Sequence, residues 1–262
     1  MIFVADGGSE FETAVPSRKS TRRNFLRTLV FIGTVIGGFA SGIIGFQTIS
    51  RVVKTSGISI PAPLQKGSIS LEETIARRRS IREYSSKPIS VSQLSQILWA
   101  AQGISHVGLR SAPSAGALYP LEIYVVVRKN GVTGLQPGIY HYENGNHTLS
   151  SMKDGDCSQE LQAASQDQEA VGNAAACIVI TAVFERTMAR YGQRGVQYVF
   201  QESGHAAQNI YLQSTALGLG CVVIGAFDDD GVRRVIGVSN DERPVSVQPI
   251  GVPYSNYSRR GN

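Results

Sequence analysis

Four arginines stand within six residues, in the run Arg77-Arg78-Arg79-Ser80-Ile81-Arg82. Guanidinium groups this close together repel one another unless acids or a bound anion neutralise them. Each can bind two phosphate oxygens at once, and the serine hydroxyl adds a further donor. The run therefore predicts a phosphate-binding segment, and a solvated helix end is the alternative interpretation.

Conventional catalytic groups are sparse in the rest of the sequence. The three cysteines are far apart and form neither a CxxC pair nor a metal-ligand pattern, so no metal site is expected. His205 lies in a predicted helix, where a structural role is the alternative to a catalytic one. The glycines near residue 220 lack the lysine, hydroxyl and third glycine that nucleotide-binding loops need. So few reactive side chains indicate a bound cofactor that supplies the reactivity.

Three further motifs follow the arginine run in order along the chain. They are Ser111-Ala112-Pro113-Ser114-Ala115-Gly116-Ala117-Leu118-Tyr119-Pro120, then Arg190-Tyr191-Gly192-Gln193-Arg194-Gly195, then Leu217-Gly218-Leu219-Gly220. With the arginine run, these motifs resemble the nitroreductase family. The first two are nearest to its SagB-type dehydrogenase branch, which includes azoline oxidases that mature thiazole- and oxazole-containing peptides. The resemblance covers residues 69–262.

The resemblance implies an α+β homodimer that binds FMN at the subunit interface, with a central, mainly antiparallel sheet flanked by helices. Arg78, Ser80 and Arg82 would contact the ribityl phosphate and the ring edge. The backbone of residues 113–116 would lie against the isoalloxazine, and that of residues 219–221 would lie on its other side. The full set of implied FMN-binding residues is Arg78, Arg79, Ser80, Arg82, Pro113, Ser114, Ala115, Gly116, Leu219, Gly220, Cys221, Arg259 and Arg260. A frayed, charged tail is the alternative for the last two.

Tyr191 is the candidate for proton transfer, because the azoline-oxidase branch uses a lysine–tyrosine pair in this role. Arg190 stands where that lysine would be. Arginine stays protonated at physiological pH, so it cannot act as a general base. The departure weakens the case for azoline oxidation and leaves flavin binding untouched. A packing or interface role is the alternative for Tyr191.

The hydrophobic patterns place these motifs on a mixed fold. Helices are expected at 71–79, from Ser90 to Gly103, and at 196–217. Strands are expected at 121–127, 174–184, 221–224 and 245–250, with a hairpin at 139–149 around Asn144-Gly145. Strands and helices mix without regular βαβ alternation, so the sequence predicts the α+β class.

The N-terminal region differs from the rest in composition. Five basic residues and no acid lie between Ser17 and Thr28, and no charge occurs from there to Ser50. The run Ser20-Thr21-Arg22-Arg23-Asn24-Phe25-Leu26-Arg27 resembles a twin-arginine export signal, with an ordinary signal anchor as the alternative. We therefore expect residues 1–50 to be a signal or membrane anchor, 51–68 a linker and 69–262 the folded domain. The chain would then be exported and extracytoplasmic or membrane-anchored.

The net charge is +5 and the pI is about 9.2. The basic residues lack interleaved aromatics and zinc-finger spacing, so nucleic acid is not expected as a partner. We expect an FMN-dependent oxidoreductase that moves hydride between a donor such as NAD(P)H and an organic acceptor, or that dehydrogenates a peptide or small metabolite. A non-catalytic, membrane-tethered flavin-binding or accessory protein is the alternative.

Overall fold

A computed structural model describes residues 57–254, which form a mixed α+β fold around one large sheet. The seven strands of this sheet are all antiparallel to their neighbours, in the order β1-β8-β7-β5-β9-β11-β10. They are β1 Ile58–Ser59, β5 Leu121–Val127, β7 Gly138–Glu143, β8 Thr148–Asp154, β9 Ala176–Ala182, β10 Gly220–Cys221 and β11 Arg243–Gly251. Helices flank the sheet, as the sequence predicts.

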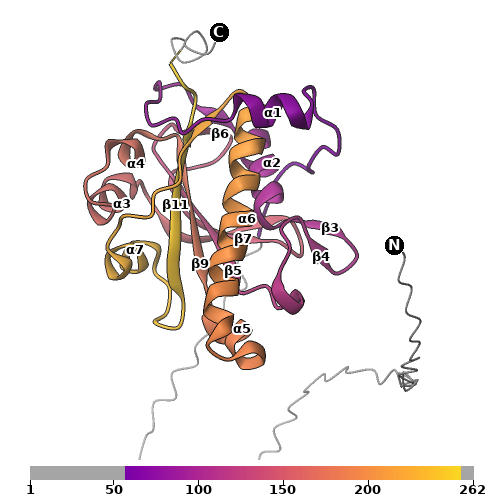
Figure 1. Ribbon diagram of the computed structural model, residues 1–262. Helices are drawn as coiled ribbons and strands as arrows, with labels where there is room; N and C mark the ends of the chain where they lie inside the picture. The colour runs from indigo at the N-terminus through magenta and orange to yellow at the C-terminus, as the bar shows by residue number, and fades with distance from the viewer. Residues whose placement is uncertain (1–56, 255–262) are drawn as a thin grey trace, which may run out of the picture. The chain divides into compact units, whose positions relative to one another are not determined.

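Two pairs of short strands lie outside the large sheet. The strands β2 Ile89–Ser90 and β6 Val132–Thr133 pair in parallel, whereas β3 Ile104–His106 and β4 Leu109–Arg110 form a hairpin. The helices are α1 Leu71–Arg77, α2 Val91–Gln102, the 3₁₀ turn η1 Ala115–Ala117, α3 Ser158–Ala164, α4 Glu169–Asn173, α5 Phe184–Tyr191, α6 Arg194–Ala216 and α7 Asp229–Ile236. Figure 1 shows α2 and α6 on one side of the sheet and α3, α4 and α7 on the other.

Strand β5 illustrates how the sequence builds two cores on one sheet. Successive side chains of a strand point to opposite faces. Ile123, Val125 and Val127 accordingly join the cluster that contains residues of α2 and α6, whereas Tyr124 and Val126 join the cluster beneath α3 and α7. Because both faces are covered, residues 123–127 of this strand form a continuous apolar run.

Helices α2 and α6 carry the side chains that reach the motifs described below. Helix α2 starts with a capping box, in which the Ser90 hydroxyl accepts from the Gln93 N–H at 3.1 Å and the Gln93 side chain accepts from the Ser90 N–H at 2.9 Å. Helix α6 has 23 residues and packs against α2, α5 and α1. It is therefore about 34 Å long at 1.5 Å per residue.

Several predicted elements differ in extent from the observed ones. The first helix ends at Arg77, two residues early, because Arg78 (φ −55°, ψ 127°) has left the helical region. The strand predicted at 221–224 is confined to Gly220–Cys221, followed by an isolated bridge between Ile224 and Val247. The hairpin around Asn144-Gly145 is present as β7 and β8, although β8 runs on to Asp154.

Part of the segment predicted as a linker packs on the sheet. Ile58 pairs with Leu149, and Ile60 is buried in the core. Further along, the Gln96 side chain accepts from the Leu64 N–H at 2.7 Å and donates to its carbonyl at 3.1 Å. The folded unit thus begins before the expected boundary at Ile69.

The predicted export signal, at residues 1–50, lies outside the described residues. Within residues 57–254, no helix combines the length and apolar character needed to cross a membrane.

Candidate functional site

The arginine run lies against the short strand β10. Beyond α1 the chain is extended, Ser80 bridges to Cys221 in parallel, and the Ile81 N–H donates to the Cys221 carbonyl at 2.9 Å. Arg82 is exposed and Arg78 is half-buried. Within residues 57–254, Arg78, Arg79 and Arg82 form no ion pair, whereas Arg77 pairs with Glu73. The run thus offers cations without an internal counter-ion, which is what a phosphate site requires.

Tyr211, on α6, connects the arginine run to the backbone after β10. Its hydroxyl lies 2.9 Å from the Ser80 Oγ and accepts the Val223 N–H at 2.9 Å. The Arg78 guanidinium lies over the same ring, 5.1 Å from its centroid. Tyr211 was not predicted from the sequence, because a single tyrosine within a long helix carries no distinctive signal.

Gly220 permits the close approach of these two segments. A Cβ at this position would stand 2.7 Å from Ile81 Cγ2 and 2.9 Å from Ile81 Cβ, too close for any side chain. The adjacent Cys221 is buried, and burial raises the pKa of its thiol to about 12. This thiol is therefore protonated at physiological pH and is not a nucleophile.

The second motif forms a strained turn, residues 113–119, which we call the 113–119 loop. Gly116 (φ 64°), Ala117 (φ 54°) and Tyr119 (φ 47°) all have positive φ. The Ser114 Oγ accepts the Tyr119 N–H at 2.9 Å, which holds the turn closed. Non-glycine residues in this conformation cluster at ligand-binding and active sites.

The third motif lies against the same loop. A Cβ at Gly116 would stand 2.8 Å from the Tyr191 hydroxyl and 2.8 Å from Arg190 Nη1. The Arg190 guanidinium also lies over the Tyr191 ring, and Tyr191 makes an edge-on contact with Tyr198. The structure therefore brings Gly116 and Tyr191, 75 positions apart in the sequence, into contact.

Glu202, on α6, is a buried carboxyl group behind the 113–119 loop that was not predicted from the sequence. Ser114, Arg110 and Gln102 lie near it and act to lower its pKa. Burial is the larger effect and raises the pKa of Glu202 to about 7. A signal was present in the sequence, because Glu202 falls on the apolar stripe between Val199 and Ala206.

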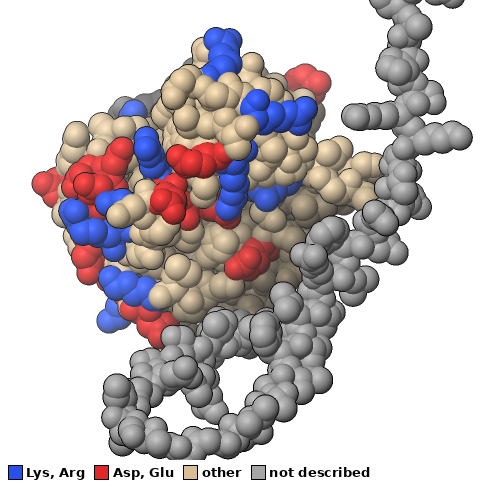
Figure 2. All heavy atoms as spheres, turned by 90° about the horizontal axis from the view of Figure 1, so that it is seen from below, with Lys and Arg blue, Asp and Glu red and all other residues tan. Residues whose placement is uncertain are grey.

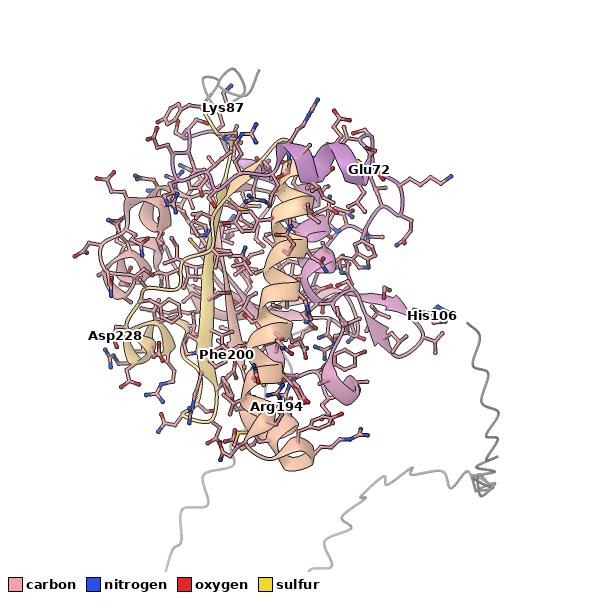
Figure 3. All side chains as sticks on the ribbon, viewed as in Figure 1. Glu72, Lys87, His106, Arg194, Phe200 and Asp228 are labelled. Atoms are coloured by element: carbon pink, nitrogen blue, oxygen red, sulfur yellow. The ribbon has the colours of Figure 1, made fainter. Side chains whose placement is uncertain are left out.

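The arginine run and the 113–119 loop with Tyr191 lie toward opposite ends of α6. Tyr211 contacts the arginine run, whereas α5, with Tyr191, precedes Arg194 at the start of α6. Arg194 and Tyr211 are about 25 Å apart along the helix at 1.5 Å per residue. Figure 3 shows this separation, with Glu72 of α1 near one end of α6 and Arg194 at the other. Arg259 and Arg260 lie outside the described residues.

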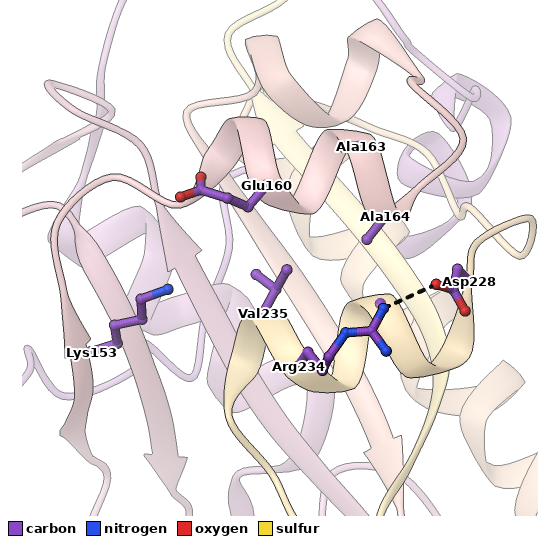
Figure 4. A pocket seen from close by; sticks show the side chains of 8 residues that line it. Lys153, Glu160, Ala163, Ala164, Asp228, Arg234 and Val235 are labelled. Carbon is purple, nitrogen blue, oxygen red and sulfur yellow. Dashed lines mark ion pairs between the residues drawn. The ribbon is translucent and has the colours of Figure 1, made fainter.

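The hollow between α3 and α7 and the mixed surface charges (Figure 2) offer little chemistry. A hollow of about 430 Å³ lies between α3 and α7, and the pair drawn in it joins Arg234 to Asp228 at 3.5 Å (Figure 4). It contains none of the motif residues. On the face drawn in Figure 2, acidic and basic side chains are interspersed, without an extended patch of one sign. Within residues 57–254, no group of three or more potential metal ligands is found.

Comparison with known proteins places the chain in a family. The model of the nitroreductase family matches residues 75–252. This chain belongs to the nitroreductase family. It is 43% identical over 184 residues to the protein MJ1384 of Methanocaldococcus jannaschii, named as a nitroreductase, a match that covers 70% of this chain and 91% of the relative. The membership confirms the resemblance read from the motifs and implies use of a flavin.

More distant relatives include a peptide-processing protein. The chain is 27% identical over 140 residues to the microcin B17-processing protein McbC of Escherichia coli. This match covers 52% of this chain and 51% of McbC. Among solved structures, a protein of Anabaena variabilis described as a nitroreductase matches with a TM-score of 0.68 and 29% identity, over 82% of this chain and 45% of that one. The chain thus spans about half the length of these two proteins.

Proposed function

We propose that this protein is an FMN-dependent oxidoreductase. The observation that carries the proposal is the arrangement of Arg78, Ser80 and Arg82 beside Gly220 and Cys221. These arginine and serine donors form no ion pair within the described residues, and they stand next to strand β10, where Gly220 lets the Ile81 segment come close. This donor set suits the phosphate and ring edge of a flavin mononucleotide, and membership of the nitroreductase family supports the choice of a flavin.

The protein residues would bind and orient the cofactor. Arg78, Ser80 and Arg82 would hold the phosphate, with Arg79 adding positive charge nearby. Backbone N–H groups of residues 114–116 would face the ring and stabilise the negative charge that accumulates on reduction, and the backbone of residues 219–221 would lie on its other side. A bound flavin would supply the hydride chemistry itself. Roles for Arg259 and Arg260 at the phosphate are part of the same proposal.

Two copies of the chain would complete each site. In one copy, the arginine run and the 113–119 loop lie toward opposite ends of α6. A two-fold axis that sets two α6 helices antiparallel would bring the loop of one copy beside the arginine run of the other. The homodimer proposed here thus follows from the spacing of the two half-sites.

Tyr191 would supply or remove a proton near the ring. Its hydroxyl lies against Gly116, in the loop assigned to the isoalloxazine. Arg190 is a permanent cation at the same place, so it would stabilise negative charge instead of accepting a proton. A dehydrogenase of peptides or small metabolites, or a nicotinamide-dependent reductase, fits this pair, and azoline oxidation is the less favoured substrate class.

Purified protein tests the proposal directly. We expect it to carry FMN, identified by mass after release, and to lose its yellow colour with NAD(P)H or another donor and regain it with an acceptor. A flavin that no donor reduces would instead favour the accessory-protein alternative.

The variant Tyr191→Phe tests the proton-transfer role. It should slow turnover without lowering flavin content.

Export through the signal-like residues 1–50 is checked separately, by fractionating cells that produce the chain with both Arg22 and Arg23 replaced by lysine.

The double variant Arg78→Ala/Arg82→Ala tests the phosphate site. At about 1.5–3 kcal/mol per charged hydrogen bond, its FMN affinity should fall roughly a hundredfold or more. The control is Arg77→Ala, since Arg77 belongs to the same run but pairs with Glu73 on the surface. Equal flavin content in the double variant and the control would overturn the assignment.

A further inference from the structure

The end of α5 and the start of α6 bring two arginines and two tyrosines together. The Arg190 guanidinium lies 5.4 Å from the centroid of the Tyr191 ring, and the Arg194 guanidinium lies 5.6 Å from the centroid of the Tyr198 ring. The two rings meet edge to face, with their centroids 5.1 Å apart. These four side chains thus form one continuous surface, which we call the Arg–Tyr surface.

Two glycines of the same motif build the corner that sets these side chains together. Gly192 ends α5 with φ 57° and ψ −145°, a conformation that glycine adopts far more readily than other residues. Gly195 lets α6 start directly against α5, because a Cβ there would stand 2.9 Å from both the backbone N and the Cα of Met188. The chain therefore turns sharply between Arg190 and Arg194, and α5 packs closely on α6.

The two arginines of the Arg–Tyr surface lack a counter-ion in the part of the chain that the structure describes. Arg186, one turn earlier on α5, pairs with Glu122, whereas no acid lies within ion-pair distance of Arg190 or Arg194 there. Both guanidinium groups are exposed. Arg194 is also the first residue of α6, as Figure 3 shows, where a cation lies at the positive end of the helix dipole. Helix stability therefore does not explain its charge.

The Arg–Tyr surface lies next to the loop assigned to the isoalloxazine. A Cβ at Gly116 would stand 2.8 Å from both the Tyr191 hydroxyl and Arg190 Nη1, and Gly116 itself is exposed. A substrate held at the ring would therefore have tyrosine rings and free guanidinium groups beside it. Tyrosine rings contact flat, apolar groups, and guanidinium groups bind carboxylate and phosphate oxygens in pairs.

We propose that the Arg–Tyr surface is the substrate site and that it selects substrates in which an anion is attached to a flat, apolar group. The inference rests on the proposed flavin function and narrows its substrate class. The anion is a carboxylate of the acceptor or the phosphate that distinguishes NADPH from NADH. Arg194 is the specificity-determining residue, because it would contact this anion without taking part in proton transfer.

The first test measures binding without turnover, in the full chain with oxidised FMN. Two pairs of unreactive ligands differ mainly in charge: benzoate against benzamide, and NADP⁺ against NAD⁺. In at least one pair, wild type should bind the more anionic member about tenfold more tightly, as charge-assisted hydrogen bonds predict. Arg194→Gln should lower that ratio to about twofold, because one of the two guanidinium groups remains. Calorimetric titration gives the affinities.

The two pairs distinguish the sources of the anion. A ratio that depends on Arg194 only for benzoate identifies a carboxylate of the acceptor, and one that does so only for NADP⁺ identifies the phosphate of the donor. If Arg194→Gln leaves both ratios unchanged, the inference is overturned. Arg194→Lys keeps the charge and should retain most of the discrimination. The control Arg234→Gln removes an arginine that pairs with Asp228 on α7, and should leave both ratios at the wild-type value.

Steady-state kinetics separate recognition from chemistry and from misfolding. For Arg194→Gln, KM for the anionic substrate should rise about tenfold while kcat and the KM for its neutral counterpart stay within about twofold. Its flavin content and urea midpoint should not fall, since a cation at the start of α6 does not stabilise the helix. An equal fall in kcat for both substrates would overturn the specificity role. Absence of a reducible flavin in wild type would instead contradict the proposed function.

Discussion

Backbone strain in the 113–119 loop is tolerated because side chains fix it from several directions. Tyr119 has φ 47°, a conformation that costs a non-glycine residue about 1–2 kcal/mol. Its N–H is bonded to Ser114, its carbonyl accepts from Arg186 Nη1 at 3.1 Å, and the Arg110 guanidinium lies 4.5 Å from its ring centroid. These contacts hold the loop in one shape before any ligand binds.

The substitution Gly116→Ala should weaken FMN binding more than it weakens folding. Gly116 has φ 64°, so alanine there costs about 1 kcal/mol of stability, and its Cβ would displace the Tyr191 hydroxyl and Arg190. Gly108→Ala is the matched control, because Gly108 has φ 73° and a Cβ added there would meet no atom within 4 Å. Urea denaturation should give similar losses for both variants, and FMN titration should separate them. Similar FMN affinities would contradict a role for the Gly116 contact.

A charged network joins strands β5 and β7 to helix α5 next to this loop. His141 lies between two carboxylates, with Nε2 3.0 Å from Glu122 and Nδ1 3.0 Å from Glu143. Glu122 also pairs with Arg186, whose Nη1 reaches the Tyr119 carbonyl. Both imidazole nitrogens face acceptors, so the doubly protonated ring is the form that satisfies the network.

This network predicts a loss of stability as pH rises. Burial opposes the charge on His141, but the hydrogen bonds to Glu122 and Glu143 outweigh it and raise its pKa above the ordinary value. The stabilisation is therefore complete below the unfolded pKa of about 6.5 and is lost as pH rises through the higher folded pKa. Urea denaturation across this range should show a decline in wild type that is absent from His141→Gln. A variant that declines in parallel with wild type would exclude His141 as the source.

The arrangement of the folded unit leaves one face of α6 uncovered. Phe200 is 54% exposed, and a Cβ at Gly204 on the next turn would meet no atom within 4 Å. This face runs between the two half-sites, where a second copy would approach in the proposed dimer. An exposed aromatic beside a glycine suits close helix–helix contact.

Placing a charge on this face should separate the subunits. We expect Phe200→Glu to be monomeric by light scattering and to retain little FMN, because a carboxylate would be buried at the interface. Met152→Glu is the control, since Met152 is 46% exposed on β8, away from α6. A dimeric Phe200→Glu protein with full FMN content would rule out this interface.

Much of the fold was predictable because its signals are local. The apolar run of β5, the Ser90 cap and the Asn144-Gly145 turn each depend on neighbours in the chain, and all three were located correctly. The predicted end of α1 was two residues too late. The segment after it pairs with Cys221 through the Ile81 N–H, and this contact between distant parts of the chain cannot be predicted from local sequence. Residues 58, 59 and 64, which were predicted to lie in a linker, belong to the folded unit for the same reason, since their partners lie on β8 and α2.

The sequence alone determined the chemical character of the site: clustered guanidinium groups, glycines where backbone must come close, and no strong nucleophile. These properties depend on residue type and order, so they can be read without a fold. Tertiary structure decided which groups meet. Only the packing of α5 and α6 on the sheet sets Tyr191 against Gly116, hides Glu202 behind Ser114 and separates the arginine run from the loop, because these contacts join positions far apart in the chain.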